Sequence, residues 1–359
     1  RGRRVTPMEK VLLYDTTLRD GAQTSGIAFS IKDKLHIAQH LDILGIDYIE
    51  GGWPSPTNQR DIEFFDAMRG ATMRQAKMTV FGSTCRKNLA AESDPQLQQL
   101  VAAGTPVVCI FGKSWDLHVT EGLRATLDEN LRMIEDSVAF LNRSDVEVIY
   151  DAEHFFDGYR ANPDYALATV QAAARGGAGW IVLCDTNGGS LPAQIRDAIR
   201  AVRGVTSIPT GIHTHNDSEL AVANTLIAVD EGARMVQGTI NGYGERCGNA
   251  NLCTVIPTLE LKMGYRALPE GQLEQLYAAA HYVAEVANMH PPEYQAYVGS
   301  AAFSHKAGVH IDSVLKLKRS YEHIPPEAVG NTTRMLVSDQ AGGSVVVERA
   351  QRLLNIKMD

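Results

Sequence analysis

The chain has 359 residues, too many for one ordinary small domain and about right for a barrel with an appended segment. Hydrophobic residues make up 44% of the sequence and charged residues 21%, the balance of a soluble globular protein with a sizeable core. The net charge is −8, and no basic cluster occurs beyond Arg1, Arg3 and Arg4, so we expect no nucleic-acid partner. No apolar run approaches the roughly 20 residues that span a bilayer, so we expect no membrane partner.

The cysteines and the first residues bear on the compartment. The sequence has five cysteines, an odd number, and no CxxC pair. Reduced thiols explain this usage better than disulfides do. The first residues also lack the apolar core of a signal peptide. We therefore expect a cytoplasmic protein.

Eight short apolar segments alternate with helix-patterned segments between residues 11 and 264. The expected strands are 11–18, 48–53, 78–84, 107–113, 146–153, 180–186, 210–215 and 235–241. The expected helices include 32–44, with Ser30 before it as a candidate N-cap, and 219–231, which follows Asp217. Strands that are apolar almost throughout are typical of a parallel sheet covered by helices. Eight such units predict an α/β protein with a (β/α)8 TIM barrel over residues 8–264, and a doubly wound open sheet is the alternative.

The pattern changes after Gly264. Residues 273–287 have the pattern of a long amphipathic helix, and Pro291 and Pro292 interrupt the chain behind it. Residues 302–321 are polar and rich in His, Lys and Tyr. We expect residues 265–359 to form a C-terminal, mostly helical extension and not a second barrel.

Polar side chains gather where the expected strands end. The C-terminal ends of the strands form the active site of TIM barrels, so these side chains should converge at one mouth. Core packing does not explain so many ionisable groups at the ends of apolar strands, and their convergence predicts an enzyme. The candidates in chain order are Asp15, Arg19, Asp20, Glu50, Ser83, Thr84, Arg86, Lys113, Asp151, Glu153, Asp185, Thr186, His213, His215, Asn216, Asp217, Asn241, Glu245 and Asn249.

The sharpest local signal is the HxH triplet formed by His213 and His215 at the end of expected strand seven. Side chains two residues apart on a strand point to the same face, so both imidazoles can reach one ion. An HxH triplet can also be a chance surface pair, but Asp20 ends strand one, which lies near strand seven in a closed ring. Two imidazoles, a carboxylate and an amide oxygen suit Zn²⁺, Mn²⁺, Co²⁺ or Mg²⁺, and ligand type alone does not choose among them. Open coordination positions would serve substrate oxygens.

Two further motifs accompany the triplet. In residues 15–21 (DTTLRDG), Arg19 stands beside Asp20, where its guanidinium could bind a carboxylate or neutralise a developing oxyanion. The alternative is that Arg19 only balances buried charge on Glu50 or Asp185. In residues 242–251 (GYGERCGNAN), the glycines let backbone pass close to a ligand, and Asn249 could supply an amide oxygen to the metal. By itself this stretch could be an ordinary flexible loop.

Taken together, residues 15–21, 213–217 (HTHND) and 244–252 (GERCGNANL) resemble the metal-dependent Claisen-condensing barrels. That family contains the isopropylmalate, homocitrate and citramalate synthases, with hydroxymethylglutaryl-CoA lyase as a relative. The resemblance covers residues 11–349. Finer features resemble the citramalate synthases within the family, at residues 50–54 (EGGWP), 81–87 (FGSTCRK), 150–158 (YDAEHFFDG) and 320–331 (SYEHIPPEAVGN).

The resemblance implies an acyltransferase that condenses acetyl-CoA with a 2-keto acid and then hydrolyses the thioester to release CoA. For a citramalate synthase the keto acid is pyruvate, and the product is (R)-citramalate for isoleucine biosynthesis. A 2-isopropylmalate or homocitrate synthase is the first alternative, and a hydroxymethylglutaryl-CoA lyase type of enzyme is the second. Pyruvate, glyoxylate and 2-oxoisovalerate stay open as substrates, because a methylene is worth only about 1–3 kcal/mol of discrimination.

The resemblance also implies a metal site. Asp20, His213 and His215 would ligate the divalent ion, with Asn249 at or near its coordination shell. The keto acid would chelate the ion through its carbonyl and carboxylate oxygens.

Further residues receive roles from the same resemblance. Arg19 would polarise the keto carbonyl, and Thr186 would hydrogen-bond the carboxylate. Glu153 would lie where acetyl-CoA loses a methyl proton. His310 and Tyr321 would reach the site of a partner subunit in a homodimer, although a surface histidine is the alternative for His310. Whether Glu153 or His310 takes the proton stays open.

Family synthases usually continue into a C-terminal domain that binds the end-product amino acid. Since this chain stops at Asp359, we expect the regulatory domain to be absent from it. No inhibitor site is therefore assigned.

Overall fold

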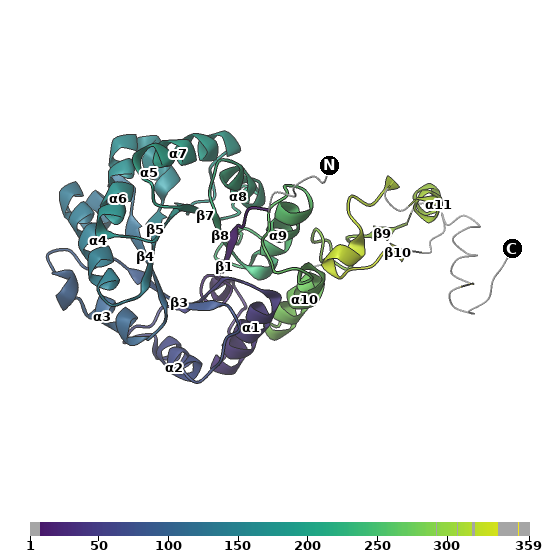
Figure 1. The fold of residues 1–359 in the computed structure, drawn as a ribbon, viewed down its shortest axis with the longest axis horizontal. Coiled ribbons are helices and arrows are strands. Elements are labelled where there is room, and N and C mark those ends of the chain that lie inside the picture. The colour runs from purple at the N-terminus through teal and green to yellow at the C-terminus, as the bar shows by residue number, and fades with distance from the viewer. Residues whose placement is uncertain (1–7, 292, 307, 318–319, 337–350, 352–359) are drawn as a thin grey trace, which may run out of the picture.

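The computed structural model describes residues 8–291, 293–306, 308–317, 320–336 and 351, so Arg1, Arg3 and Arg4 lie outside the described residues. Figure 1 shows a closed ring of strands surrounded by helices, with a C-terminal segment that projects from one side. The strands β1 to β8 form a closed barrel in chain order, and β8 pairs in parallel with β1. The predicted (β/α)8 barrel is confirmed.

Every barrel strand coincides with an expected segment, but several end early. The strands are β1 (Leu12–Asp15), β2 (Tyr48–Gly52), β3 (Lys77–Ser83), β4 (Val107–Lys113), β5 (Glu147–Glu153), β6 (Trp180–Asp185), β7 (Thr210–Thr214) and β8 (Met235–Gly238). Beyond β1 the chain turns at once, because the N–H groups of Arg19 and Gly21 donate to the carbonyl oxygen of Thr16. Arg19 and Asp20 therefore lie on a turn above the strand and not within it.

Helices cover the outside of the barrel. They are α1 (Ile31–Leu44), α2 (Gln59–Met68), α3 (Pro95–Ala102), α4 (Leu127–Asn142), α5 (Phe155–Ala161), α6 (Pro163–Gly176), α7 (Pro192–Val205), α8 (Ala221–Asp230) and α9 (Leu252–Leu261). Helix α1 begins at the expected cap: Ser30 Oγ accepts the Asp33 N–H at 3.1 Å, and the Asp33 carboxylate accepts the Ser30 N–H at 2.9 Å. The expected helix 219–231 is shorter in the structure, because Glu219 has a left-handed φ of 57° and α8 begins after it; Asp217 pairs with Arg246 at 2.8 Å and does not cap the helix.

The barrel interior is packed with side chains and becomes polar toward one mouth. Its apolar part consists of Tyr14, Tyr48, Phe81, Val107, Cys109, Ile149, Val182, Cys184 and Met235. Alternate residues of a strand point to the same side, so the inward positions of β5 run from Ile149 through Asp151 to Glu153. The alternation that places apolar side chains in the core therefore also places carboxylates at the mouth of the barrel.

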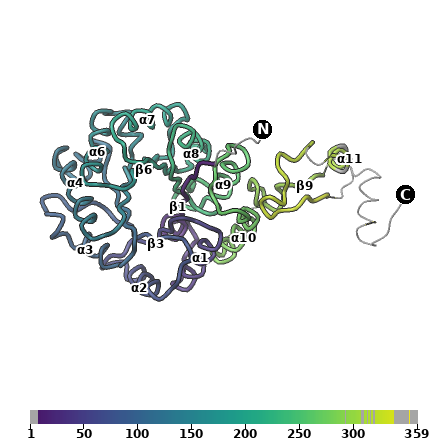
Figure 2. Tube along the Cα trace, viewed as in Figure 1, coloured from purple at the N-terminus to yellow at the C-terminus, as the bar shows by residue number. Residues whose placement is uncertain are grey.

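The segment after the barrel contains helix and a little sheet. Helix α10 (Leu276–Val286) packs on α1, where the rings of His40 and Tyr282 stack with centroids 3.7 Å apart. Further along, the described residues include α11 (Gly308–Lys316) and a two-stranded parallel sheet of β9 (Ser304–His305) and β10 (Arg334–Met335). The extension therefore adds a short sheet to the expected helices, and Figure 2 shows it projecting from the barrel beside α10.

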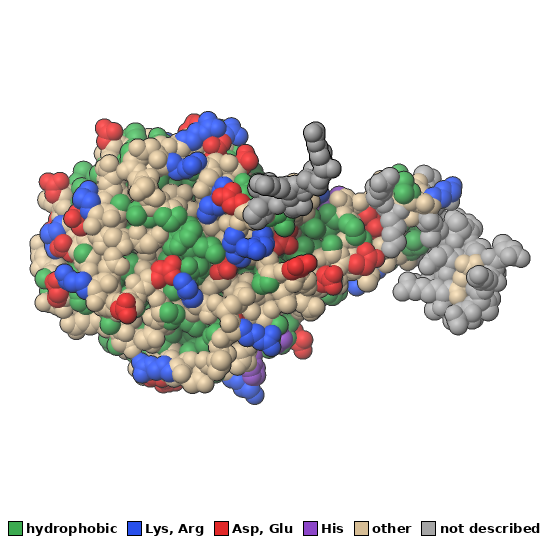
Figure 3. Space-filling model, viewed as in Figure 1, with side chains coloured by type: hydrophobic (Ala, Val, Ile, Leu, Met, Phe, Trp, Pro, Cys, Tyr) green, Lys and Arg blue, Asp and Glu red, His purple; other side chains and the backbone are tan. Residues whose placement is uncertain are grey.

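The described surface of the barrel carries charges of both signs. Figure 3 shows acidic and basic side chains interspersed over one face of the barrel, without a large region of one sign. Within the part of the chain that the structure describes, no helix combines the length and apolar character needed to cross a membrane. The described cysteines are all free thiols, and only Cys247 is exposed.

Candidate active site

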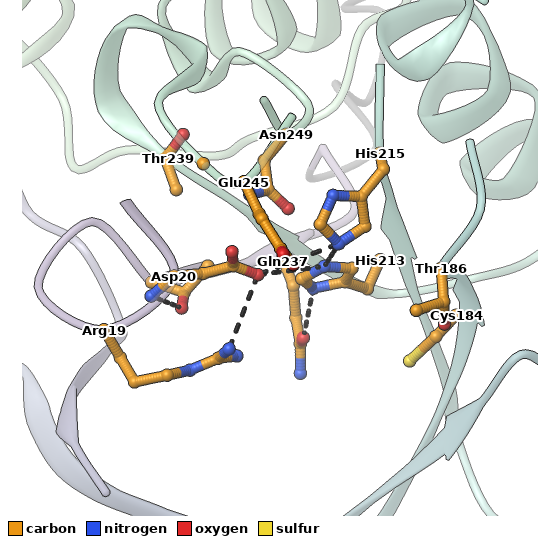
Figure 4. Close-up of polar contacts among 12 residues, drawn as sticks. Arg19, Asp20, Cys184, Thr186, His213, His215, Gln237, Thr239, Glu245 and Asn249 are labelled. Atoms are coloured by element: carbon orange, nitrogen blue, oxygen red, sulfur yellow. Dashed lines mark hydrogen bonds and ion pairs between the residues drawn. The ribbon is translucent and has the colours of Figure 1, made fainter. Parts of the chain in front are cut away.

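Asp20, His213 and His215 meet at the C-terminal mouth of the barrel. The Nε2 atoms of the two histidines are 3.3 Å apart, and they lie 3.6 and 3.8 Å from Asp20 Oδ2. Atoms about 2.1 Å from a common ion lie about 3.0–3.5 Å from one another, so these three atoms are within a few tenths of an ångström of the spacing around one divalent cation. All three residues are buried, and Figure 4 shows both imidazoles directed at the carboxylate.

Asn249 lies beside this triad because its backbone forms a bridge with His215. The loop can fold back this tightly because Gly248 has a φ of 88°, and a Cβ there would lie 2.0 Å from a backbone oxygen. The Nδ2 of Asn249 donates to the carbonyl oxygen of Tyr243 at 3.2 Å. In the described structure, Asn249 Oδ1 and Asp20 Oδ1 are buried acceptors without a hydrogen-bond partner. Orphaned oxygens beside two imidazoles fit a cation site.

The triad has the protonation states that a metal requires. Burial lowers the pKa of the His213 imidazole, and it lowers the pKa of His215 to about 3, so both rings are neutral near pH 7. Burial alone would raise the pKa of Asp20, but the Arg19 guanidinium holds it below its usual range. Two neutral imidazoles and a carboxylate are therefore available as ligands.

The lowered pKa of the imidazoles predicts a metal affinity that is nearly constant between pH 8 and pH 6. Two imidazoles with an ordinary pKa of about 6.5 would compete with protons and lose on the order of tenfold in affinity over this range. Calorimetric titration with Mn²⁺ at both pH values measures the difference, and a tenfold loss would contradict the prediction. The metal-free fold should lose stability below about pH 6.5, because the unfolded chain then binds protons that the folded imidazoles exclude.

A buried hydrogen-bond chain orients His213. Its Nδ1 donates to Gln237 Oε1 at 2.9 Å, and Gln237 Nε2 donates to Asp151 Oδ1 at 3.0 Å. Because an amide oxygen only accepts, Nδ1 carries the proton and Nε2 presents its lone pair to the site. Sequence reasoning missed Gln237, which is uncharged and precedes the end of β8. Its register opposite His213 is the signal that could have found it.

Replacing Gln237 with leucine is expected to lower metal affinity by about 10–100-fold, the usual effect of losing the partner that orients a ligating histidine. The change removes the acceptor of His213 Nδ1 without touching a ligand. Thr169→Val is a matched control, because it removes another fully buried polar group, on α6, which bonds to Ser114 and to the carbonyl oxygen of Ala166 and not to the triad. Calorimetry with Mn²⁺ compares the two variants, and equal affinities would refute the positioning role.

Arg19 is held above β2 by a buried carboxylate. Its Nε donates to Glu50 Oε1 at 2.5 Å, and Thr16 Oγ1 donates to the same oxygen at 2.6 Å. The guanidinium lies 3.9 Å above the Phe81 ring, and its Nη1 is 3.5 Å from Asp20 Oδ2. Arg19 therefore does balance the charge of Glu50, and the same contacts fix its guanidinium at the edge of the triad.

A cavity of about 190 Å³ opens above the triad. It is lined by Arg19, Asp20, Gln23, Trp53, Phe81, Phe111, Asp151, Glu153, Cys184, Thr186, His213, His215, Glu245 and Arg246. The Glu153 carboxylate forms an ion pair with Lys113 at the end of β4. A larger cavity of about 730 Å³ adjoins the first and also borders Arg19, Gln23 and Trp53. The arrangement provides a small chamber lined by ionisable side chains beside a larger cavity.

Some candidates lie elsewhere. The His310 and Tyr321 rings are 4.5 Å apart on the exposed face of the extension, and neither lines the cavity of its own barrel. Asp15 accepts hydrogen bonds from the N–H and hydroxyl of Thr17, and Asp185 accepts hydrogen bonds from the N–H and hydroxyl of Ser190. These two aspartates hold turns of the backbone beneath the site.

The fold and site define a TIM barrel whose mouth carries a candidate metal centre. Residues 10–283 match the HMGL-like family model, so the chain belongs to that family. Residues 297–359 match the model described as homocitrate synthase post-HMGL domain-like. The solved HMG-CoA lyase of Bacillus subtilis has a TM-score of 0.67 and 19% identity, covering 80% of this chain and 97% of that one, which supports the fold.

Several relatives are similar over nearly the whole chain. The (R)-citramalate synthase of Aquifex aeolicus is 55% identical over 95% of this chain and 65% of that protein. The (R)-citramalate synthase of Geobacter sulfurreducens is 53% identical, with coverages of 98% and 66%. The homocitrate synthase AksA of Methanopyrus kandleri is 34% identical, with coverages of 96% and 83%. The chain thus spans just under two thirds of the length of these two citramalate synthases.

Proposed function

We propose that this protein is an acyltransferase that condenses acetyl-CoA with pyruvate to give (R)-citramalate and CoA, in the cytoplasm and toward isoleucine. The observation that carries this proposal is the buried Asp20, His213 and His215 triad beneath a small polar cavity. Identities of 49–55% to five (R)-citramalate synthases favour pyruvate as the keto acid. Homocitrate and 2-isopropylmalate synthases are less similar, at 33–34%.

The triad, with Asn249 Oδ1, would hold a divalent cation such as Zn²⁺, Mn²⁺, Mg²⁺ or Co²⁺. When bound, the cation would supply Lewis-acid polarisation and a template for the oxygens of the keto acid. The Arg19 guanidinium would stabilise the negative charge that develops on the keto oxygen during attack. The Thr186 hydroxyl would donate to the carboxylate of the keto acid, which fixes the face that is attacked.

The acetyl methyl group must lose a proton before its carbon can attack the keto carbonyl. Glu153 borders the cavity, and we propose it as the base if the base comes from the same subunit as the metal site. The adjoining larger cavity has room for the longer co-substrate. Water then cleaves the thioester, so that the carboxylate of the product forms and the CoA thiol leaves.

The extension supports a homodimer as the complete enzyme. His310 and Tyr321 lie on a segment that projects from its own barrel, and Tyr294, Leu317 and Leu336 are exposed there by 83%, 51% and 46%. A second copy would cover this apolar surface and receive the two polar side chains at its barrel mouth. We accordingly propose residues 8–264 as the catalytic barrel and 265–359 as the extension that serves a partner.

The test is release of free thiol from acetyl-CoA by the purified protein with Mn²⁺ and one keto acid at a time. Release with pyruvate, and little with 2-oxoisovalerate or glyoxylate, is the expected result. A higher rate with 2-oxoisovalerate would favour a 2-isopropylmalate synthase. Absence of thiol release with every keto acid would reject the synthase proposal.

A further inference from the structure

The hydroxyl of Thr186 is held on its acceptor side by the loop that follows β5. The N–H of His154 donates to Thr186 Oγ1 at 2.8 Å. Arg246 Nη2 donates to the carbonyl oxygen of Thr186 at 2.7 Å, so the residue is anchored from two loops. Among the described residues no hydrogen bond uses the proton of this hydroxyl. Since Thr186 lines the small cavity, that proton is available to an acceptor bound there.

His154 adopts a backbone conformation that needs support. Its φ of 55° and ψ of 32° are left-handed, which is uncommon for a residue other than glycine. Its side chain supplies a restraint, because His154 Nδ1 lies 3.1 Å from Asp157 Oδ2. The ring also packs edge-on against His118, with centroids 4.3 Å apart. The direction of the His154 N–H therefore depends on a side chain three residues further along.

The same carboxylate oxygen reaches the neighbouring loop. Asp157 Oδ2 also accepts a hydrogen bond from Asn187 Nδ2 at 2.9 Å, and Asn187 directly follows Thr186. Asp157 is buried, and its other oxygen pairs with Arg160 at 2.9 Å on the solvent side. One buried atom thus joins the loops after β5 and β6, on either side of Thr186.

We infer that Asp157 is a positioning residue that, through His154 and Asn187, aims the Thr186 hydroxyl at the carboxylate of the keto acid. This inference rests on the proposed function and names a residue that acts on binding of the keto acid. Without the carboxylate, the two loops lose their common anchor, and the Thr186 hydroxyl loses its fixed direction. Binding of acetyl-CoA and of the metal should not depend on these hydrogen bonds, because Asp157 contacts neither the triad nor the larger cavity.

The first test compares Asp157→Asn with Arg160→Ala. Asp157→Asn is expected to raise KM for pyruvate about tenfold, the scale of one hydrogen bond to a charged group, and to leave KM for acetyl-CoA and Mn²⁺ content within about twofold. Arg160→Ala removes the other partner of the same carboxylate, a mostly exposed side chain, and should leave both KM values within about twofold. An unchanged pyruvate KM in Asp157→Asn would overturn the inference.

The second test asks whether Asp157 acts through Thr186. In a Thr186→Val background, adding Asp157→Asn should raise KM for pyruvate by less than about twofold, because the hydroxyl that it aims is already gone. A full additional tenfold rise would show that Asp157 acts independently and would overturn the inference. If Asp157→Asn fails to fold, Asn187→Ala can replace it in this test. That change removes the hydrogen bond from Asn187 to Asp157 at an exposed residue.

Both comparisons can be repeated without turnover. Calorimetry then measures the affinity of each variant for pyruvate in the Mn²⁺-loaded protein, without acetyl-CoA. If the unaltered chain binds pyruvate but releases no thiol, the proposed function fails while the coupling of Asp157 to Thr186 can still be measured. If it releases thiol and Asp157→Asn binds pyruvate normally, the inference alone fails.

Discussion

Asp20→Ala and His215→Ala are each expected to lose bound metal and activity together. Each change removes one of three ligand atoms that lie 3.3–3.8 Å from one another. The two remaining side chains cannot complete the site, and loss of the cation should lower kcat by on the order of 10³-fold or more. Metal content after dialysis and thiol release from acetyl-CoA measure the two losses.

Matched controls separate the site from general damage to the fold. Asp66→Ala and His36→Ala remove the same side-chain types at exposed positions on α2 and α1, and should keep both metal and rate. A variant of Asp20 or His215 that kept full metal content and full rate would show that the triad is not the metal centre.

Arg19→Ala is expected to keep the metal and to lower kcat by about 10²–10³-fold, the usual cost of removing a group that stabilises a developing oxyanion. The guanidinium touches the triad only through a 3.5 Å contact with Asp20 Oδ2 and is not a ligand. Steady-state kinetics together with metal analysis of the same sample test the prediction. If Arg19→Ala lost metal and turnover to the same extent, Arg19 would be needed to maintain the metal site and not for the reaction itself.

Arg19→Lys sharpens this experiment. Lysine keeps the positive charge opposite Glu50 but cannot form the planar fork of a guanidinium. The free energy of unfolding should stay closer to that of the unaltered chain than in Arg19→Ala, where Glu50 becomes a buried carboxylate without a charged partner. If kcat falls in Arg19→Lys while the free energy of unfolding is kept, then Arg19 acts on the reaction itself and not only on the stability of the fold.

The barrel and the triad could be predicted because both follow from periodic patterns in the sequence. Alternation along a strand places His213 and His215 on one face, and closure of an eight-strand ring brings Asp20 to them. The hydrogen-bond partners of these groups could not be predicted in the same way. Gln237 is an uncharged residue inside β8, and its role depends on the register between two strands that are separated by a helix in the chain.

The ends of helices and strands could not be predicted from the sequence as well as their positions. The expected strand extends past Asp15 to Leu18, yet β1 ends at Asp15 because side chains of Thr16 and Thr17 hold the turn above it. Helix α8 starts two residues later than expected, since Glu219 is left-handed and Asp217 is paired with Arg246 from a distant loop. In both cases a contact from outside the local segment decides the boundary.

The chain from His213 through Gln237 to Asp151 runs inside the barrel from β7 and β8 to β5, a strand that pairs with neither of them. The strand that it reaches also carries Glu153, two residues beyond Asp151. A local opening that frees β5 would release the brace on His213, so the proposed ligand and the proposed base belong to one cooperative unit. Occupancy of the centre by a cation would then suppress fluctuations of β5, a strand that carries none of its ligands.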